Sequence, residues 1–449
     1  MSCEFELDSA ELEPLLRPGF IFGMATAAYQ IEGAASEDGR SDSVWDVFCR
    51  QRGNIRNGDS GDIACDHYHR WQQDVSLLSD LGVDAYRFSI SWSRVLPEDS
   101  AGMNQKGMAF YCRLVDELLS AGIRPLVTLH HWDLPQYLQE QGGWTQRRTA
   151  YRFAEFAELV ATQFAKTVDF YTTINEPWCV AFLGHRLGVH APGIRQDAAA
   201  FAAAHHLLLG HGMAVRELRS SAPHAEVGIV LNGGPSHPAS PSDEDAAAAL
   251  LAESEQIHLF TDAVLLGEYP EALAGKIASC LQAGDLDVIA ERCDYLGWNY
   301  YTRNVVRAAA RGTFELLPSN EFPVTDMGWE VYPEGLREVL ESLDRRYDLP
   351  PLYVTENGSA FPDAVVRGTV NDVDRIAYLQ SHLRIVADLV REGFDIRGYI
   401  CWSLMDNFEW AEGYSKRFGL VHVDYETQER IVKDSGRAFA RLMSCKADF

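Results

Sequence analysis

Positive charge is scarce in this sequence of 449 residues, which has 39 lysines and arginines against 65 aspartates and glutamates and a formal net charge of -26 at pH 7. A negative surplus of this size repels nucleic acid and anionic membrane surfaces, so we expect neither as a partner. The sequence has no glycine-rich phosphate loop, and we therefore expect no nucleotide cofactor. A neutral small molecule is compatible with this charge.

Paired cysteines, long hydrophobic runs and clustered metal ligands are also missing. The nine cysteines include no Cys-x-x-Cys pair, so we expect reduced thiols rather than a disulfide framework. The sequence begins with no basic and apolar leader, and no apolar run approaches the roughly 20 residues of a membrane span, so a cytoplasmic protein is expected. His67 and His69, and the pair His205-His206, lack further ligands in a recognisable arrangement, so no metal is expected. The sequence leaves a homo-oligomer open.

Strand-like and helix-like segments alternate along the whole sequence. This alternation is typical of parallel strands joined by crossover helices, and eight units favour a closed (β/α)8 TIM barrel, of class α/β, over an open doubly wound sheet. No linker divides the chain, so we expect a single domain over residues 1–449, with a barrel core at about 20–445 and extended loops at the C-terminal face. The expected strands are Phe20–Thr26, Ala85–Ile90, Arg124–Leu129, Asp169–Ile174, Glu226–Leu231, Tyr295–Asn299, Leu352–Thr355 and Ile396–Ser403; the expected helices are Tyr68–Leu81, Lys106–Ala121, Thr149–Lys166, Ala198–Ser220, Asp243–Leu266, Glu334–Arg346 and Asp372–Glu392.

Two glutamates stand out because each follows a short strand-like run and precedes a residue that breaks the strand. Glu176 directly precedes Pro177, and Glu356 lies two residues before Gly358. Both side chains are therefore expected where a strand ends, at the barrel mouth where catalytic residues collect. Two carboxylates that face each other across a sugar are the minimum needed to break a glycosidic bond. On spacing alone, two glutamates in surface salt bridges would fit equally well.

Six sequence motifs settle this ambiguity by resemblance. In order along the chain, they closely resemble the family 1 glycoside hydrolases, the β-glucosidases and their relatives. The resemblance runs nearly from end to end and implies the barrel fold independently. The motifs are residues 22–33 (FGMATAAYQIEG), 86–94 (YRFSISWSR), 173–177 (TINEP) with 354–358 (VTENG), 402–410 (WSLMDNFEW) and 413–420 (GYSKRFGL).

The resemblance implies that Glu176 is the general acid/base and Glu356 the nucleophile. In a retaining enzyme the two carboxyl groups lie about 5–5.5 Å apart, and the acid must hold a proton near neutral pH, so its pKa must be raised by burial or by the neighbouring anion. The matching Arg87 and Tyr301 are implied to contact the nucleophile and keep it ionised. Asn175 is implied to bind the sugar 2-hydroxyl, although a turn-forming role before Glu176 is also open.

The resemblance also implies the side chains that bind the substrate. Amide, imidazole, carboxylate and indole groups contact the hydroxyls at the rim of a sugar, and an aromatic face covers its C–H side, for which Trp402 is the expected platform. Candidates for the leaving-group side, the aglycone site, are Trp178, Cys179, Leu183, His185, Asn232 and Trp329. The expected sugar-binding residues are Gln30, His131, Trp132, Asn175, Asn299, Trp402, Glu409, Trp410 and Phe418.

Two positions, Glu409 and Phe418, indicate which class of sugar the site accepts. In the branch of the family that cleaves 6-phospho-β-glycosides, a serine replaces Glu409 and a tyrosine replaces Phe418 to form a phosphate pocket with a lysine. Lys416 matches that lysine, but Glu409 is expected to repel a phosphate. We therefore expect an unphosphorylated sugar.

The expected function is that of a retaining exo-β-glucosidase, which releases terminal non-reducing β-D-glucosyl residues from cellobiose, short oligosaccharides or aryl β-glucosides through a covalent glycosyl-enzyme. A β-galactosidase, a β-fucosidase or a transglycosylase with the same site is the alternative. A non-catalytic sugar-binding relative is disfavoured because both carboxylates are present, and a thioglucoside-cleaving relative is disfavoured because Glu176 is not a glutamine.

Overall fold

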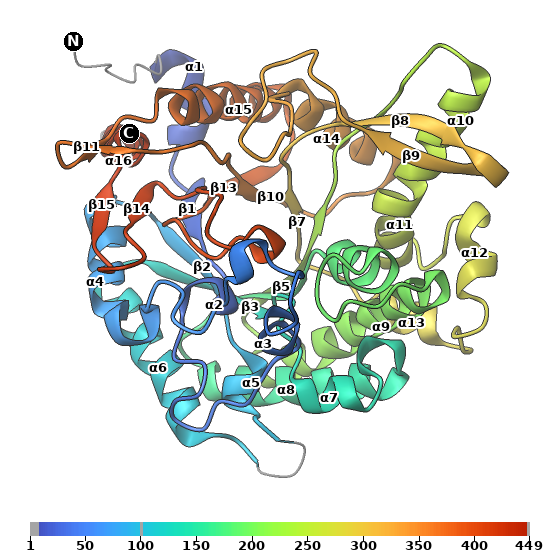
Figure 1. Ribbon diagram of the computed structural model, residues 1–449, viewed down its shortest axis with the longest axis horizontal. Coiled ribbons are helices and arrows are strands. Elements are labelled where there is room, and N and C mark those ends of the chain that lie inside the picture. Colours follow the sequence, from blue (N-terminus) through green and yellow to red (C-terminus); the bar gives the residue numbers. More distant parts are fainter. Residues whose placement is uncertain (1–8, 99–101, 447–449) are drawn as a thin grey trace.

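The computed structural model of the protein describes residues 9–98 and 102–446, and its centre is a closed barrel of eight parallel strands (Figure 1). All eight predicted strands are confirmed, with ends that differ by at most two residues. The order around the barrel is β1-β13-β10-β7-β5-β4-β3-β2. The strands are β1 Ile21–Ala25, β2 Ala85–Ser89, β3 Arg124–His130, β4 Phe170–Asn175, β5 Glu226–Asn232, β7 Tyr295–Asn299, β10 Leu352–Asn357 and β13 Ile396–Trp402.

Aromatic side chains fill the inside of the barrel. The Phe170 and Tyr295 rings stack with centroids 4.2 Å apart, and Tyr353 meets both rings edge-on. These residues, with Leu126 and Ile400, belong to one buried cluster. A filled barrel has no through channel, so a ligand can bind only at one end of it.

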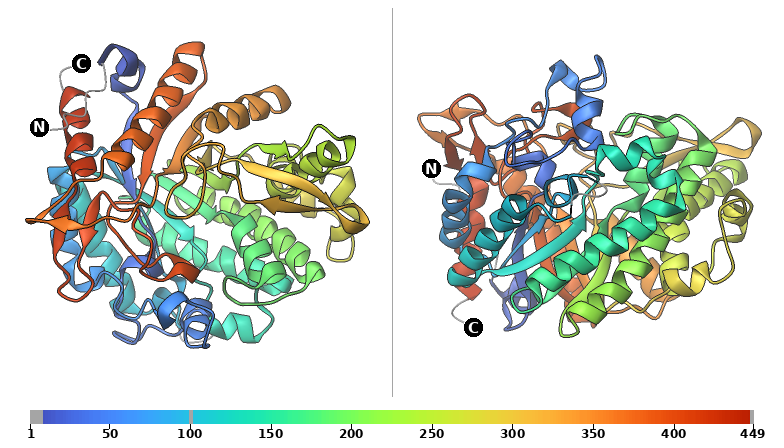
Figure 2. Two further views of the ribbon diagram at one scale, coloured as in Figure 1. Left: turned by 45° about the horizontal axis from the view of Figure 1, so that its top comes forward. Right: turned by 90° about the horizontal axis from the view of Figure 1, so that it is seen from below.

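Helices surround the barrel, as the two further views in Figure 2 make plain. All of the predicted helices are present, but residues 243–266 form three segments because a π-helical turn, η4, interrupts the predicted single helix. The corresponding elements are α4 His67–Asp80, α6 Gln105–Ser120, α8 Arg147–Phe164, α9 Asp197–Ser221, α10 Asp243–Glu253, η4 Ser254–His258, α11 Leu259–Leu265, α14 Glu334–Arg346 and α15 Val373–Glu392.

Helix α9 corrects the expectation that no apolar run in the sequence approaches the length of a membrane span. By length and composition it would suffice to cross a membrane, and 78% of its most apolar window is buried inside the protein. It packs against α8 and β4, and its alanines and leucines form part of the main core. Its apolar character is therefore that of a core helix.

Inserted segments extend the barrel at the end where the strands have their carboxyl termini. One is a small sheet of β6 (Ser236–Pro238), β8 (Asn304–Ala309) and β9 (Thr313–Leu317), in which β8 and β9 form a hairpin. Others are the π-helical segment η3 (Cys179–Leu187) after β4 and the helix α12 (Glu271–Ile277). After β13 comes a loop with the short helix η6 (Trp410–Glu412), followed by the pair β14 (Val421–Val423) and β15 (Arg430–Val432) and by α16 (Asp434–Lys446).

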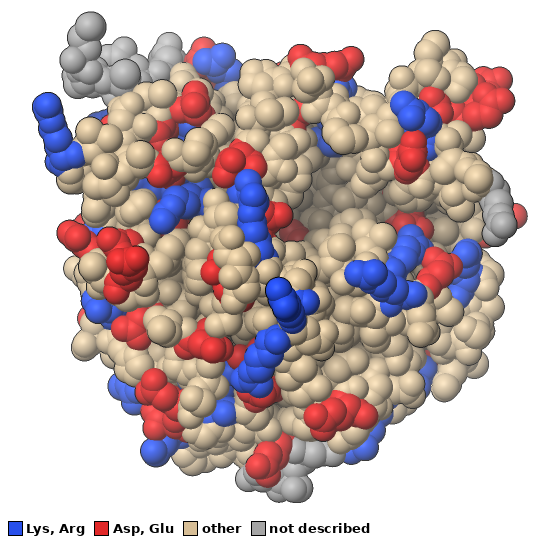
Figure 3. Space-filling view, viewed as in Figure 1, with Lys and Arg blue, Asp and Glu red and all other residues tan. Residues whose placement is uncertain are grey.

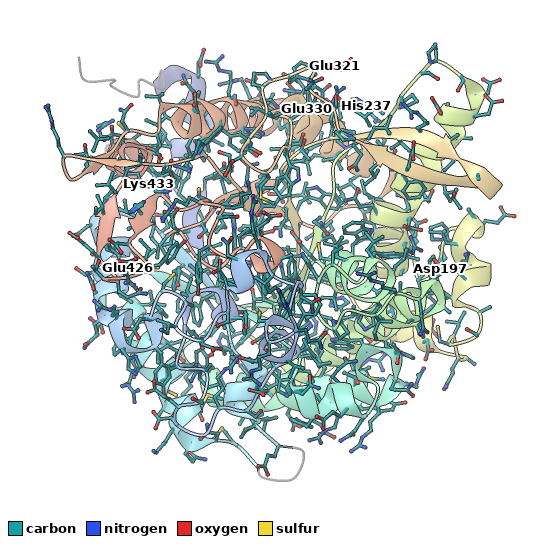
Figure 4. All side chains as sticks on the ribbon, viewed as in Figure 1. Asp197, His237, Glu321, Glu330, Glu426 and Lys433 are labelled. Carbon is teal, nitrogen blue, oxygen red and sulfur yellow. The ribbon has the colours of Figure 1, made fainter. Side chains whose placement is uncertain are left out.

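A buried cluster of charges fixes the loop after β13. Lys433, labelled in Figure 4, forms ion pairs with Asp363 and with Asp406, the latter at 2.6 Å, and Arg417 binds Asp406 at 2.7 Å. Arg375 binds Asp363 at 2.9 Å. Lys433 and Asp406 are fully buried, so removal of one partner would leave an uncompensated charge in the interior. The cluster therefore holds the loop, which carries Glu409 and Phe418, in one position.

Gly358 is expected to be essential at the contact between β10 and β13. An added Cβ would lie 1.7 Å from the Trp402 carbonyl oxygen and 2.9 Å from its carbon, so the two strand ends would have to separate. We expect Gly358→Ala to lower the free energy of unfolding by about 2 kcal/mol or more. Its kcat/KM should also fall because Glu356 and Trp402 lie on these two strands.

Gly275→Ala in helix α12 is the matched control, since nothing lies within 4 Å of its added Cβ. A glycine-to-alanine change inside a helix stabilises by about 0.5–1 kcal/mol. Urea unfolding of both variants, with activity measured on the same samples, is the check. Equal stability of the two variants would contradict the steric argument.

Candidate active site

A cavity of about 320 Å³ opens at the carboxyl ends of the barrel strands. It lies in the hollow beside the β8–β9 hairpin on the face drawn in Figure 3. Gln30, Arg87 and Asn175 do not line the cavity but are buried directly behind its wall, with at most 1% of each residue exposed. The predicted site residues that line it are His131, Trp132, Glu176, Asn299, Tyr301, Trp329, Glu356, Trp402, Glu409, Trp410 and Phe418.

Glu176 is the first residue after β4 and has a left-handed backbone conformation, with φ of 46°. The Asn299 side-chain amide donates to its Oε1 at 2.7 Å, and the Cys179 thiol donates to its Oε2 at 3.0 Å. Burial and, second, the charge of Glu356 raise the pKa of Glu176 to about 7. The carboxyl group can therefore hold a proton near neutral pH, as expected for a general acid.

Glu356 lies within β10 rather than after its end, which corrects the predicted strand boundary by two residues. Arg87 donates to its Oε1 at 2.5 Å, and the Tyr301 hydroxyl donates to its Oε2 at 2.8 Å. Burial raises the pKa of Glu356, while the charge and hydrogen bonds of Arg87 lower it. Because the direct guanidinium contact belongs to Glu356 and not to Glu176, Glu356 is the member of the pair that ionises first.

Asn175 connects the two glutamates. Its side-chain oxygen accepts hydrogen bonds from Arg87 at 2.7 Å and from Asn299 at 3.1 Å. Arg87 also binds Glu356, and Asn299 also binds Glu176, so three side chains form a continuous chain of hydrogen bonds from one carboxyl group to the other. Such a chain limits the rotation of both carboxyl groups.

Aromatic rings form one wall of the cavity. His131 stacks on Trp402 and on Trp410, with centroids 5.7 Å and 6.1 Å apart, and Trp132 lies 4.5 Å from Trp410. Three buried polar atoms at this wall have no partner among residues 9–98 and 102–446, namely Gln30 Oε1, His131 Nδ1 and Glu409 Oε2. Buried polar atoms without partners are rare, and their position here is typical of a site that a polar ligand completes.

The acidic residues that line the cavity are Glu176, Glu356 and Glu409. No lysine or arginine is found among the described residues that line it. Burial, followed by the charges of Glu356 and Glu176, raises the pKa of Glu409 to about 8, so this carboxyl group holds a proton at neutral pH. Lys416, which could have bound a phosphate, instead donates to the backbone oxygen of Asp326 at 2.5 Å and lies 3.2 Å from its carboxylate.

Most of the predicted aglycone residues lie together at the other end of the cavity. Trp178, Cys179, Leu183, Asn232 and Trp329 line it. His185 is an exception and corrects the expectation, because its ring is buried and its Nδ1 contacts the Val180 carbonyl at 2.9 Å. A π-helical backbone sets the direction of this side chain, and the sequence does not reveal that conformation.

Arg303 holds the segment that carries Trp329. Its guanidinium binds Glu330 at 2.7 Å, Glu321 at 2.5 Å and His237 at 3.0 Å, and all three partners are labelled in Figure 4. Glu330 also accepts hydrogen bonds from Ser319 and from two backbone amides of the segment. This cluster positions Trp329 beside Tyr301, with ring centroids 5.5 Å apart.

The sequence did not identify several residues of the cavity, which come mostly from inserted segments. His190 packs against Trp132 at 5.5 Å, and Thr302 follows the Asn299-Tyr300-Tyr301 run. Gly233, Gly234 and Thr302 had one signal, their place shortly after a predicted strand. The other unpredicted residues that line the cavity are Gly233, Gly234, Gln256, Asn304, Leu316 and Met327.

The histidine pairs noted in the sequence have protein partners. His67 binds Asp74 at 2.8 Å, His69 binds Asp66 at 2.6 Å, and His205 lies between Tyr269 and Asp285. Within the part of the chain that the structure describes, no group of three or more His, Cys, Asp or Glu side chains is arranged to hold a metal ion.

A barrel mouth with one protonated and one guanidinium-bound glutamate, lined by aromatic rings and free polar atoms, defines a glycoside hydrolase. Comparison with known proteins agrees, since the model of glycosyl hydrolase family 1 matches residues 13–448. The chain belongs to that family.

Individual relatives are similar over nearly their whole length. A β-glucosidase from Agrobacterium sp. (strain ATCC 21400) is 47% identical over 443 residues, which cover 95% of each chain. A bifunctional β-D-glucosidase/β-D-fucosidase from Bifidobacterium breve is 46% identical over 456 residues, with 95% of this chain and 97% of the relative covered. The solved structure of virulence factor SghA from Agrobacterium tumefaciens has a TM-score of 0.94 and 46% identity and covers 97% of this chain and 99% of its own.

The Cys179 thiol is expected to tune Glu176. Its hydrogen bond to the carboxylate lowers the pKa of Glu176, against the rise caused by burial. In Cys179→Ala this donor is lost, so the pKa of Glu176 should rise and the alkaline limb of kcat/KM should move to higher pH by roughly half a pH unit. Cys179→Ser retains a donor and should restore the wild-type limb or move it lower. Identical pH profiles for all three proteins would contradict this role.

Proposed function

We propose that the protein is a retaining exo-β-glucosidase with Glu176 as general acid/base and Glu356 as nucleophile. The observation that supports this most directly is the unequal environment of the two glutamates in one cavity. Glu176 has a pKa of about 7, whereas Glu356 is bound by Arg87 and Tyr301. Unequal carboxyl groups that face one cavity are what double displacement at an acetal requires.

In the first step Glu176 gives its proton to the oxygen of the leaving group while Glu356 attacks the anomeric carbon. The anion of Glu356 also stabilises the oxocarbenium character of the transition state. Tyr301 and Arg87 hold the carboxylate in the orientation for attack through the bonds to its two oxygens. Asn175 lies between Arg87 and His131, where it is close to a sugar bound in front of Glu356.

In the second step water hydrolyses the glycosyl-enzyme. Once Glu356 is esterified its charge is gone, so the Coulombic contribution that raises the pKa of Glu176 disappears. Glu176, which gave up its proton in the first step, therefore remains ionised and takes a proton from water as the water attacks the anomeric carbon from the side the leaving group left and displaces the Glu356 carboxylate. The configuration at this carbon is therefore retained.

The substrate that fits this site is a neutral β-glycoside. The cavity has three carboxyl groups and no lysine or arginine among the described residues that line it. Lys416 is bound to Asp326 and is not available to a ligand. Glu409 holds a proton at neutral pH, so it has no charge that would repel a phosphate group, contrary to the expectation from the sequence. The lack of a lysine or arginine among the described residues that line the cavity is therefore the stronger argument against a phosphorylated sugar. The free polar atoms of Gln30, His131 and Glu409 suit the hydroxyls of a terminal sugar.

Glucose is the proposed sugar, with tolerance for galactose or fucose. The bifunctional relative from Bifidobacterium breve supports the second candidate, a β-fucosidase activity on the same site. Cellobiose, short oligosaccharides and aryl β-glucosides are the proposed substrates, and the protein needs no cofactor. The eight free cysteines in residues 9–98 and 102–446 support the proposal of a reducing, cytoplasmic location for a single catalytic domain.

The two glutamates are expected to respond differently to truncation. Glu356→Ala should lose nearly all turnover of 4-nitrophenyl β-D-glucoside, and azide should restore turnover with inverted product because a small anion takes the place of the nucleophile. Glu176→Ala should lose about 10²–10⁴-fold in kcat/KM on substrates with poor leaving groups and much less on nitrophenyl glycosides.

Kinetics on cellobiose and on nitrophenyl glucoside, with product configuration by NMR, checks both variants. Glu244→Ala, on the exposed side of α10, is the control and should behave as wild type. Unchanged turnover in both active-site variants would end the assignment of the two roles.

Phosphorylation of the sugar is expected to abolish its use as a substrate. A phosphate on the 6-hydroxyl would enter a cavity with no free cation, so kcat/KM for 4-nitrophenyl 6-phospho-β-D-glucoside should be lower than for the free glucoside by about 100-fold or more. The matching galactoside and fucoside, measured in the same assay, give the sugar preference. Faster cleavage of the phosphorylated substrate would overturn the proposed substrate class.

A further inference from the structure

A second and larger cavity adjoins the catalytic one. It has a volume of about 720 Å³ and lies between η3, α12 and the β8–β9 hairpin. We name it the distal groove and define it by Phe182, Leu187, Phe201, Leu251, Leu273 and Phe314. Four residues, Trp178, Gln256, Asn304 and Leu316, line both cavities. A molecule that extends out of the catalytic cavity past Trp178 and Leu316 therefore enters the distal groove.

The walls of the distal groove are mainly apolar. Phe182 and Phe201 meet edge-on with centroids 5.5 Å apart, and Phe314 lies on the facing hairpin. Leu187 and Leu316 each have 51% of their surface exposed. Large exposed leucines around a hollow are costly in water, and a bound apolar group would cover them.

The charged groups of the groove are paired with one another. Arg186 binds Asp197 at 2.8 Å and also forms an ion pair with Glu255, and Lys276 binds Asp197 at 2.7 Å. Asp197 is labelled at this side of the molecule in Figure 4. These two cations and two anions have no formal net charge between them, and Glu315 is paired with Arg307. The groove therefore favours neither a cationic nor an anionic ligand.

Two side-chain amides at the entrance to the groove bind each other. The Asn304 side chain donates to the Gln256 side-chain oxygen at 2.7 Å, which links the two amides at the junction of the cavities. An oligosaccharide would need free donors and acceptors for its hydroxyls, whereas an alkyl or aryl chain needs only apolar surface. The pairing of the two amides and of the four charged groups, together with the apolar walls, argues for the second kind of occupant.

We infer that the distal groove binds the far end of a long, neutral and apolar aglycone, so that alkyl and extended aryl β-glucosides are favoured substrates. This inference rests on the proposed β-glucosidase function and specifies its substrate class. The sugar occupies the cavity of Glu176 and Glu356, and the aglycone passes Trp178 and Leu316 to reach Phe182 and Phe314.

The test is the dependence of kcat/KM on chain length, measured as glucose release. The substrates are methyl, butyl, octyl and dodecyl β-D-glucoside below the concentrations at which they form micelles, and the cello-oligosaccharides from cellobiose to cellopentaose. Burial of methylene groups should raise kcat/KM from butyl to dodecyl glucoside by about tenfold. The cello-oligosaccharides should show no comparable rise beyond cellotriose.

Two variants place the effect in the groove. Leu187→Asp and Phe314→Asp introduce a charge on opposite walls, and each should lower kcat/KM for dodecyl glucoside by about fivefold. Neither residue lines the catalytic cavity, so methyl and 4-nitrophenyl glucosides report whether the fold and the chemistry are intact. Leu250→Asp is the matched control, because Leu250 is 67% exposed and lies outside both cavities.

The outcomes separate this inference from the proposed function. Cleavage of 4-nitrophenyl β-glucoside without any rise along the alkyl series overturns the inference and leaves the function standing. A rise along the cello-oligosaccharides that Leu187→Asp removes assigns the groove to sugars and also overturns it. If Leu250→Asp lowers kcat/KM for dodecyl glucoside as much as the two groove variants do, the inference is also overturned. A wild-type protein that cleaves no β-glucoside refutes both.

Discussion

The bond between Arg87 and Glu356 is the interaction on which the arrangement of the catalytic centre depends. Arg87 lies on β2, Glu356 on β10 and Asn175 on β4, and one guanidinium bridges all three strands. A buried ion pair contributes little to folding because the loss of hydration offsets the attraction. Its effect is instead to fix the orientation and the ionisation of the Glu356 carboxyl group, at a distance that the closure of the barrel sets.

Much of this centre could be predicted from the sequence because its signals are local. Strand β7, Tyr295–Asn299, has the predicted bounds because a short apolar run is followed directly by polar residues, and the same pattern located Glu176 and Glu356. The two-residue error at β10 arose because the strand continues through Glu356 to Asn357, and the Asn357 side chain binds the Tyr300 carbonyl at 2.7 Å.

The remaining features depend on contacts between segments that are distant in the sequence. The hydrogen bond from Asn299 to Glu176 joins residues 123 positions apart, and no local pattern indicates it. Gln256 reaches the cavity from η4, which is π-helical, and His190 reaches it from the segment after the π-helical η3; this conformation has no reliable sequence signal. The burial of α9 is equally a tertiary property, since its composition alone matches that of a membrane span.

The two ends of the cavity are built from different parts of the fold. Glu356 and Arg87 belong to barrel strands and Glu176 directly follows one, whereas Trp329 lies on an inserted segment that Arg303 and Glu330 hold in place. A substitution or a change of length in that segment leaves the hydrogen bonds between the barrel strands intact. The leaving group that the enzyme accepts is therefore free to diverge between descendants of this chain while the bond it cleaves stays the same.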